Sequence, residues 1–215
     1  MEKIVAILVI LLLCGSSSFG EERKPGKLPI IFSEHYDITL FGLQKLHPFD
    51  TEKYGKIYRY LVNKVGIDKN RFYTPEIVPD EDLLSVHTKE YLSSLNKSVN
   101  IARIAESGIL SLLPNSLLQS HILKPMKYAT GGTILGVELA LKYGWAINLS
   151  GGYHHAKAGS GGGFCFFADV PIAVYKLFKK NPDLSVMIID LDAHQGNGYE
   201  SIFKKFNPDI VFTST

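Results

Sequence analysis

The sequence predicts an α/β fold in which helices cover both faces of a parallel sheet. Strand-like runs at residues 145–150, 185–192 and 209–214 alternate with helix-like runs along the second half of the chain. These runs are almost wholly apolar, as is typical of strands that are buried on both faces of a parallel sheet. The composition agrees, because 46% of the 215 residues are hydrophobic and 20% are charged, which suits one domain with a sizeable core.

Residues 1–20 have the three parts of a secretory signal peptide. Lys3 precedes a ten-residue apolar core, Ile4–Leu13, and Ser18 and Gly20 stand at positions −3 and −1 of a cleavage site. The apolar core is about half as long as a membrane-spanning helix requires. We therefore expect a cleaved signal peptide, with a signal-anchor as the alternative, and a location in the secretory pathway or outside the cell.

The first half of the fold combines one strand with amphipathic helices. Thr51 is the expected N-cap of the first helix, acidic residues fill the first turn of the second, and Gly144 ends the third. His35, His87 and His121 are expected to be packing or surface side chains. The predicted elements are a strand at 28–33 and helices at 49–66, 80–95 and 130–143.

In the second half, helices at 167–180 and 198–206 connect the strands, with Pro171 confined to a first turn. Parallel strands present their carboxyl ends at one edge of the sheet, and ligands bind beyond that edge in open α/β sheets. Two unusual segments lie there: "GGYHHA" follows the strand at 145–150, and "DLDAH" ends the strand at 185–192. The two segments are therefore expected to meet in space.

Asp192 and His194 form a candidate metal-binding pair. On an extended strand end, side chains two residues apart project to the same side, so a carboxylate oxygen and an imidazole nitrogen can reach one ion. Such a pair suits zinc and also manganese or iron. Asp190 lies one step deeper on the same face, where it can orient a histidine. A strand end whose acids merely cap the next helix is the simpler alternative.

The adjacent His154 and His155 are candidates for proton transfer. On a regular strand they would point to opposite faces, but the glycines around them permit an irregular backbone that brings both rings to one cavity. A metal-bound water needs a base to take its proton, and an amide leaving group needs an acid. Two imidazoles with different partners can divide these tasks.

Five segments, taken in order, resemble the class IV branch of the histone deacetylase family. The resemblance covers residues 28–215 and implies an arginase/deacetylase-like parallel sheet. It rests on "PIIFSEHYDITLFGLQKLHPFD", "DEDLLSVHTKEYL", "TGGTILGVELALKYGWAINLSGGYHHA", "GGGFCFFAD" and "IIDLDAHQGNGYE".

The resemblance implies a role for each residue of the site. His155 is the general base toward a zinc-bound water, while His154 pairs with Asp190 and acts electrostatically or in proton transfer. Asp192 and His194 are two of three zinc ligands. Gly163 and Phe164 line the tunnel that takes the acylated lysine. A potassium ion is held nearby by Asp190, Asp192 and His194.

The implied reaction is hydrolysis of the acyl-lysine amide bond, with zinc polarising the carbonyl and the water. Asn197 stands where some branches carry an aspartate that orients the second histidine. Because Asn adds no charge, we expect a less basic His155 than an aspartate would give.

Three other functions remain open. Arginase-like hydrolases with two manganese ions use an Asp-x-His-x-Asp run, but the last position here is Gly196, which favours one catalytic metal. An acetylpolyamine or other small-amide hydrolase would use the same site chemistry. A catalytically dead protein that binds acyl-lysine is the non-enzyme alternative.

The third zinc ligand of the family, an aspartate, has no counterpart after His194. We therefore expect the chain to be the N-terminal portion of a deacetylase-like domain with its C-terminal part missing, and to be inactive alone. The family resemblance would place it in the nucleus or cytoplasm, against the signal peptide. A net charge of +2 gives no electrostatic argument for nucleic acid binding.

Overall fold

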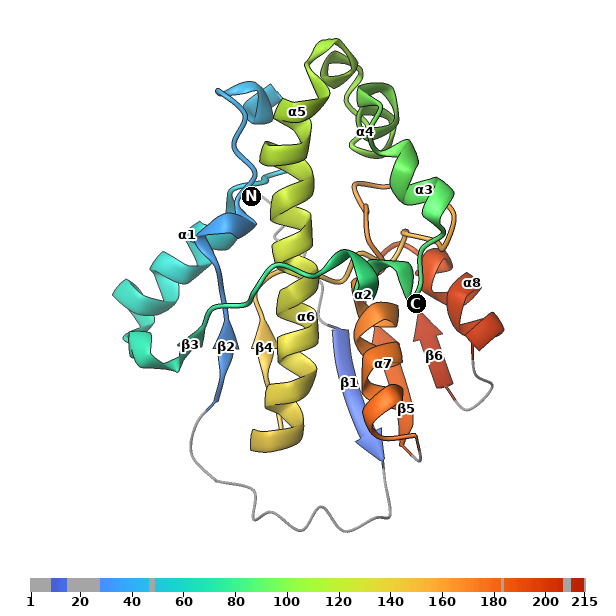
Figure 1. Cartoon of the computed structure of the whole chain (residues 1–215). Coiled ribbons are helices and arrows are strands. Elements are labelled where there is room, and N and C mark those ends of the chain that lie inside the picture. The colour runs from blue at the N-terminus through green and yellow to red at the C-terminus, as the bar shows by residue number, and fades with distance from the viewer. Residues whose placement is uncertain (1–8, 15–27, 47–48, 183, 207–209, 215) are drawn as a thin grey trace.

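A computed structural model describes residues 9–14, 28–46, 49–182, 184–206 and 210–214 of the chain. Within these residues the strands form two sheets, with the orders β3-β2-β4 and β1-β5-β6 (Figure 1). The strands are β1 (Val9–Cys14), β2 (Ile30–Ile31), β3 (Phe72–Tyr73), β4 (Ile147–Asn148), β5 (Ser185–Asp190) and β6 (Ile210–Ser214).

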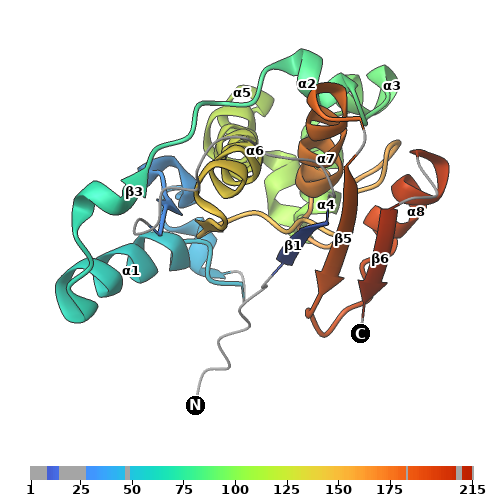
Figure 2. The ribbon, with the colours of Figure 1, turned by 90° about the horizontal axis from the view of Figure 1, so that it is seen from below.

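Helices lie on both sides of the strands, as right-handed crossover connections require. The chain moves from β2 to β3 in one direction and then returns past β2 to β4, so α1 and α6 lie on opposite faces of this sheet (Figure 2). α6 and α7 lie side by side. The helices are α1 (Lys53–Tyr60), α2 (Asp80–Leu84), α3 (Lys89–Ser94), α4 (Ser98–Ile104), α5 (Asn115–Leu118), α6 (Lys124–Tyr143), α7 (Asp169–Lys180) and α8 (Asn197–Phe206).

The strand pairings confirm the predicted α/β class. β2 is parallel to both β3 and β4, and β5 is parallel to β6. Every strand predicted from an apolar run is present, although β2 and β4 are only two residues long. α6 ends at Gly144, whose φ of 94° is in the left-handed region, as the glycine there predicted.

β1 lies inside the predicted signal peptide. Its residues pair antiparallel with β5 from Val9–Asp190 to Cys14–Ser185, and it lies between β4 and β5 in Figure 1. The other residues of the predicted signal peptide, 1–8 and 15–20, lie outside the described residues. Cleavage after Gly20 stays a prediction.

Two details of the predicted helices are wrong. Thr51 does not cap α1, because its buried hydroxyl donates to the Ile38 carbonyl and α1 begins after Glu52. The helix predicted at 80–95 is divided into α2 and α3. The division lies at His87, which is hydrogen-bonded to a distant loop, and at Thr88, whose side chain accepts from the Tyr91 amide and begins α3.

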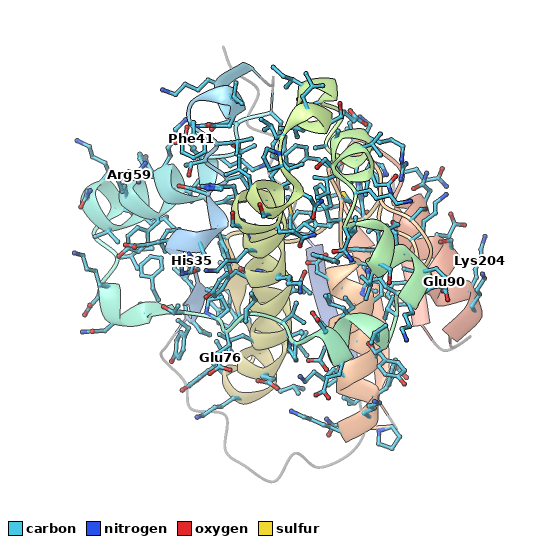
Figure 3. All side chains as sticks on the ribbon, turned by 45° about the horizontal axis from the view of Figure 1, so that its top comes forward. His35, Phe41, Arg59, Glu76, Glu90 and Lys204 are labelled. Atoms are coloured by element: carbon cyan, nitrogen blue, oxygen red, sulfur yellow. The ribbon has the colours of Figure 1, made fainter. Side chains whose placement is uncertain are left out.

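Charged side chains of both signs are spread over the surface. Figure 3 shows Arg59, Glu76, Glu90 and Lys204 at the outer surface, on α1, on the segment before α2, on α3 and on α8. Within the described residues no helix is both long enough and apolar enough to cross a membrane.

Candidate active site

The two segments singled out in the sequence lie together beyond the carboxyl ends of β4 and β5. The ring centroids of His154 and His155 are 4.1 Å apart, and the His155 and His194 rings are 5.9 Å apart. The carboxyl ends of β4 and β5, which belong to two sheets, therefore bring the histidines of the two segments together.

Glycines shape the turn that carries the histidines. Gly151 and Gly152 have φ values of 96° and 77°, which glycine adopts without steric cost. A Cβ on Gly151 would lie 2.5 Å from the Thr133 hydroxyl and 2.6 Å from Asp169 Oδ2. Both the backbone conformation and the tight packing therefore require glycine.

His154 is a buried histidine held by a carboxylate. Its Nδ1 lies 2.7 Å from Asp190 Oδ2, and both side chains are at most 4% exposed. Because Asp190 accepts at Nδ1, we place a proton on that nitrogen, which directs Nε2 toward Asp192 Oδ1 at 3.7 Å. The predicted pairing of His154 with Asp190 is present.

His155 is more exposed and has a neutral partner. Its Nδ1 lies 3.3 Å from Asn197 Oδ1, so Nδ1–H donates and Nε2 keeps its lone pair. Burial and the neighbouring charge of His154 lower the pKa of His155 below its ordinary value, against a smaller opposing effect of the Asn197 hydrogen bond. Near neutral pH this imidazole is therefore unprotonated and able to accept a proton.

Asp192 and His194 present a carboxylate oxygen and an imidazole nitrogen that could coordinate a metal ion. Asp192 is 4% exposed, its Oδ1 accepts from the His194 amide at 2.8 Å, and His194 Nδ1 lies 3.1 Å from the same oxygen. Burial by itself would raise the pKa of Asp192, but hydrogen bonds from His194 and the charges of His154 and His194 lower it below its ordinary value. The carboxylate is thus ionised, as a metal ligand must be.

The separation of this pair fits zinc. Two ligand atoms about 2 Å from a tetrahedral zinc ion lie roughly 3.3 Å from each other. Asp192 Oδ1 and His194 Nδ1 are 3.1 Å apart in a hydrogen bond, which a zinc ion bound by both atoms would replace. The described residues contain no cluster of three His, Cys, Asp or Glu side chains that could complete a metal site. The pair is therefore compatible with zinc, but it supplies only two of the three protein ligands that a catalytic zinc site needs.

The first turn of α8 fixes the backbone of the tandem histidines. The amides of Gly198 and Tyr199 both donate to the His154 carbonyl, at 2.9 and 3.2 Å. A Cβ on Gly198 would lie 2.5 Å from the carbonyl oxygens of His154 and Ala156. The close approach of α8 that brings Asn197 to His155 therefore depends on glycine at position 198.

Gly163 and Phe164 lie beside His155, where the resemblance placed a tunnel wall. A Cβ on Gly163 would be 2.5 Å from His155 Cδ2, and Phe164 has a φ of 61°, held in part by a hydrogen bond from its amide to the Ile104 carbonyl. The Phe164 ring packs at 5.1 Å from Phe49, on a segment before α1. This contact of Phe49 with Phe164 was not predicted from the sequence.

Two further site residues were missed. Lys53 lies over the Phe49 ring at 4.2 Å, and burial lowers the pKa of Lys53 despite the opposing charges of Asp50 and Asp192. Asp169 is fully buried at the start of α7 and bonds to the turn before the histidines. Neither has a local sequence signal, because each reaches the site from a separate element.

A family model described as the histone deacetylase domain matches residues 47–215, which is more than half of the chain and includes every residue of the site. The chain belongs to the histone deacetylase family. Its membership confirms the resemblance at the level of the family.

Among curated relatives of this deacetylase-family chain, histone deacetylase 2 of Arabidopsis thaliana is 43% identical over 193 residues, which are 86% of this chain and 50% of the relative. The acetoin utilization protein AcuC of Bacillus subtilis is 29% identical over 189 residues, 86% of this chain and 48% of that protein. The chain thus spans about half the length of these relatives.

Solved structures support the fold of the family. The crystal structure of an HDAC homolog from Aquifex aeolicus aligns with a TM-score of 0.66 at 21% identity, covering 88% of this chain and 50% of that chain. An HDAC homolog complexed with SAHA gives a TM-score of 0.65 at 22% identity, with the same coverage. At this identity the likeness shows that the deacetylase fold is shared.

Proposed function

We propose that this protein is a zinc-dependent hydrolase of acyl-lysine amide bonds, a lysine deacylase of the class IV type. One observation carries the proposal: two adjacent histidines with different partners, Asp190 and Asn197, face the Asp192–His194 donor pair. A structural role alone would not explain a buried carboxylate–histidine pair beside an unprotonated, half-exposed histidine.

The residues of the site divide the work of amide hydrolysis. His155, unprotonated and partly exposed, accepts the proton of the attacking water at Nε2. His154 is held in a fixed orientation by Asp190 and acts electrostatically or in proton transfer near the reacting carbonyl. Phe49 and Phe164 exclude bulk water from an apolar acyl-lysine side chain.

Asp192 and His194 would hold the metal. Zinc bound there would supply a Lewis acid for the carbonyl and the water. We propose that the third ligand lies outside the described residues, so that the 215-residue chain alone is inactive. The potassium ion implied at Asp190, Asp192 and His194 stays a prediction.

We also propose that the enzyme acts in the secretory pathway or outside the cell, since residues 1–20 have the parts of a signal peptide. There it would meet acylated lysines of proteins other than histones. Mass spectrometry of the N-terminus of the protein from its natural source tests this, and an N-terminal peptide starting at residue 21 is expected. Retention of Met1 in a nuclear or cytoplasmic fraction would contradict it.

The activity test uses the protein isolated from its natural source, with its intact mass and zinc content measured together. One bound zinc per chain and chelator-sensitive hydrolysis of acyl-lysine peptides are expected. The same full-length protein expressed recombinantly with His155→Ala is expected to be at least about 100-fold slower. Turnover confined to N-acetylated polyamines would instead identify the small-amide hydrolase. Zinc-free protein that binds acyl-lysine peptide without hydrolysis would identify the non-catalytic alternative.

A further inference from the structure

Asp169 is a buried carboxylate outside the set of proposed catalytic groups and ligands. It is the first residue of α7 and is fully buried, yet no lysine, arginine or histidine pairs with it in the described part of the chain. Burying an ionised group without a counter-ion is costly unless hydrogen bonds satisfy it. The hydrogen-bond partners of Asp169 therefore indicate the role of this carboxylate.

Four donors from three parts of the fold converge on Asp169. Oδ2 accepts from the Gly152 amide at 2.9 Å and from the Thr133 hydroxyl of α6 at 2.6 Å. Oδ1 accepts from the Tyr153 amide at 2.9 Å and from the Tyr199 hydroxyl of α8. The position of Asp169 in the first turn of α7 adds the favourable field of the helix N-terminus.

The two amides held by Asp169 belong to the turn that leads directly into the histidines. Gly152 has a φ of 77°, and its carbonyl accepts from the His154 amide at 2.9 Å, so the turn is tight. On the other side, α8 holds the His154 carbonyl. Asp169 and α8 together fix the backbone on both sides of His154.

We propose that Asp169 is the positioning residue of the tandem-histidine turn, directing His154 to Asp190 and His155 to Asn197. The inference rests on the proposed deacylase function only for its kinetic consequence. A displacement of about 1 Å in a catalytic group can cost 100-fold in rate. The carboxylate acts through the backbone of its neighbours and does not touch the reacting atoms.

Asp169→Asn is a sharp test because it keeps the shape and removes one acceptor. Each carboxylate oxygen accepts one backbone amide, so either orientation of the Asn side chain sets an NH₂ group against an N–H of Gly152 or Tyr153. The turn must then open on one side. The matched control is Asp82→Asn, which removes an ion pair between α2 and Lys176 of α7, away from the histidines.

The experiment compares imidazole ¹⁵N spectra, kcat and KM of the wild type and the two variants, each expressed recombinantly at the full length found for the natural protein. Asp169→Asn is expected to change the tautomer or protonation signals of His154 and His155 and to lower kcat by about 100-fold with KM within a few-fold. Asp82→Asn is expected to leave both readouts near wild type.

Wild-type histidine signals with near-wild-type kcat in folded Asp169→Asn would overturn the proposal, even if the variant is less stable. Should that variant fail to fold, Thr133→Val is used instead, because it removes one side-chain donor to Asp169 and leaves both backbone hydrogen bonds to the carboxylate. Smaller shifts of the same histidine signals are then expected. Their absence would overturn the proposal. A wild type without deacylase activity would refute the proposed function, while the spectra would still test the role of Asp169.

Discussion

At the scale of single residues, the partner of each histidine decides its role. His154 is bonded to a buried carboxylate, and His155 is bonded to the neutral side chain of Asn197. Tandem histidines that share a turn therefore have electrostatically different partners. The family resemblance implied both pairings, and both hydrogen bonds are present.

Asn197→Asp is expected to raise the pKa of His155, because a carboxylate favours the protonated ring. The base must be unprotonated, so activity is lost as the pH falls through this pKa. We expect the acid limb of the kcat/KM profile to move up by about one pH unit. Gln195→Glu is the matched control, since it adds the same charge at an exposed position that is not bonded to His155. Equal shifts in both variants would contradict a specific effect of position 197.

His87 is a buried histidine that joins two distant segments. Its Nε2 accepts from the Ala168 amide at 2.9 Å, and its Nδ1 lies 3.3 Å from the Ala158 carbonyl. Burial lowers the pKa of His87 to about 4, despite hydrogen bonds to Ala158 and Lys157 that raise it. The expectation of a packing residue is correct, although the sequence did not indicate what His87 joins.

The stability of the protein should depend on pH through His87. The unfolded state binds this proton near pH 6.5 and the folded state only near pH 4, so the stabilisation is complete above pH 6.5 and is lost as the pH falls toward 4. The loss is on the order of 3 kcal/mol. Chemical denaturation at several pH values should show that the free energy of unfolding depends less on pH in His87→Gln than in the wild type. His121→Gln is the control and should keep the wild-type pH dependence, because His121 is a partly exposed histidine bonded to the Thr39 carbonyl. Equal slopes in wild type and His87→Gln would count against this role.

At the scale of elements, the site depends on how α8 meets the tandem-histidine turn. α8 was predicted from its amphipathic pattern, but the hydrogen bonds from its first turn to the His154 carbonyl could not be. The prediction of one continuous helix at 80–95 was wrong for a related reason. The break at His87 results from bonds to residues far along the chain, which outweigh the local helical pattern.

Gly198→Ala should separate α8 from the turn. Its Cβ would lie 2.5 Å from two carbonyl oxygens, which cannot move without shifting His154. We expect a loss of about 1–3 kcal/mol in the free energy of unfolding, together with loss of activity. Thermal and chemical denaturation measure the first effect. Gly159→Ala is the control, because its Cβ would meet nothing within 4 Å; equal effects of the two substitutions would exclude the contact with α8 as the cause.

At the scale of the whole molecule, apolar strand runs and intervening helices were sufficient to predict the class. The order of strands was not predictable, since β2 and β4 are only two residues long and their neighbours are set by crossover connections. The sequence also did not predict that β1 pairs with β5. A run of aliphatic residues satisfies both a signal peptide and a strand.

Deletion of residues 1–20, which gives the same chain as the proposed signal cleavage, should expose one edge of β5, because six residue pairs join β1 to it. A free strand edge favours pairing with other chains. We expect a lower melting temperature and concentration-dependent self-association, measured by thermal denaturation and size-exclusion chromatography. Deletion of residues 1–8 alone retains β1 and serves as the control. Identical behaviour of the two deletions would show that β1 contributes nothing to the fold.

The Phe49–Phe164 contact has a consequence for how new substrate preferences could arise. Phe164 lies next to His155 in a segment with little freedom to change, whereas Phe49 belongs to a separate segment before α1 that makes none of the bonds to His154 or His155 described above. Substitutions at Phe49 can change this contact with Phe164 while His154 and His155 keep their hydrogen bonds. If the proposed deacylase function holds, selection for shorter or longer acyl groups could therefore act on Phe49 and leave the histidine turn unchanged.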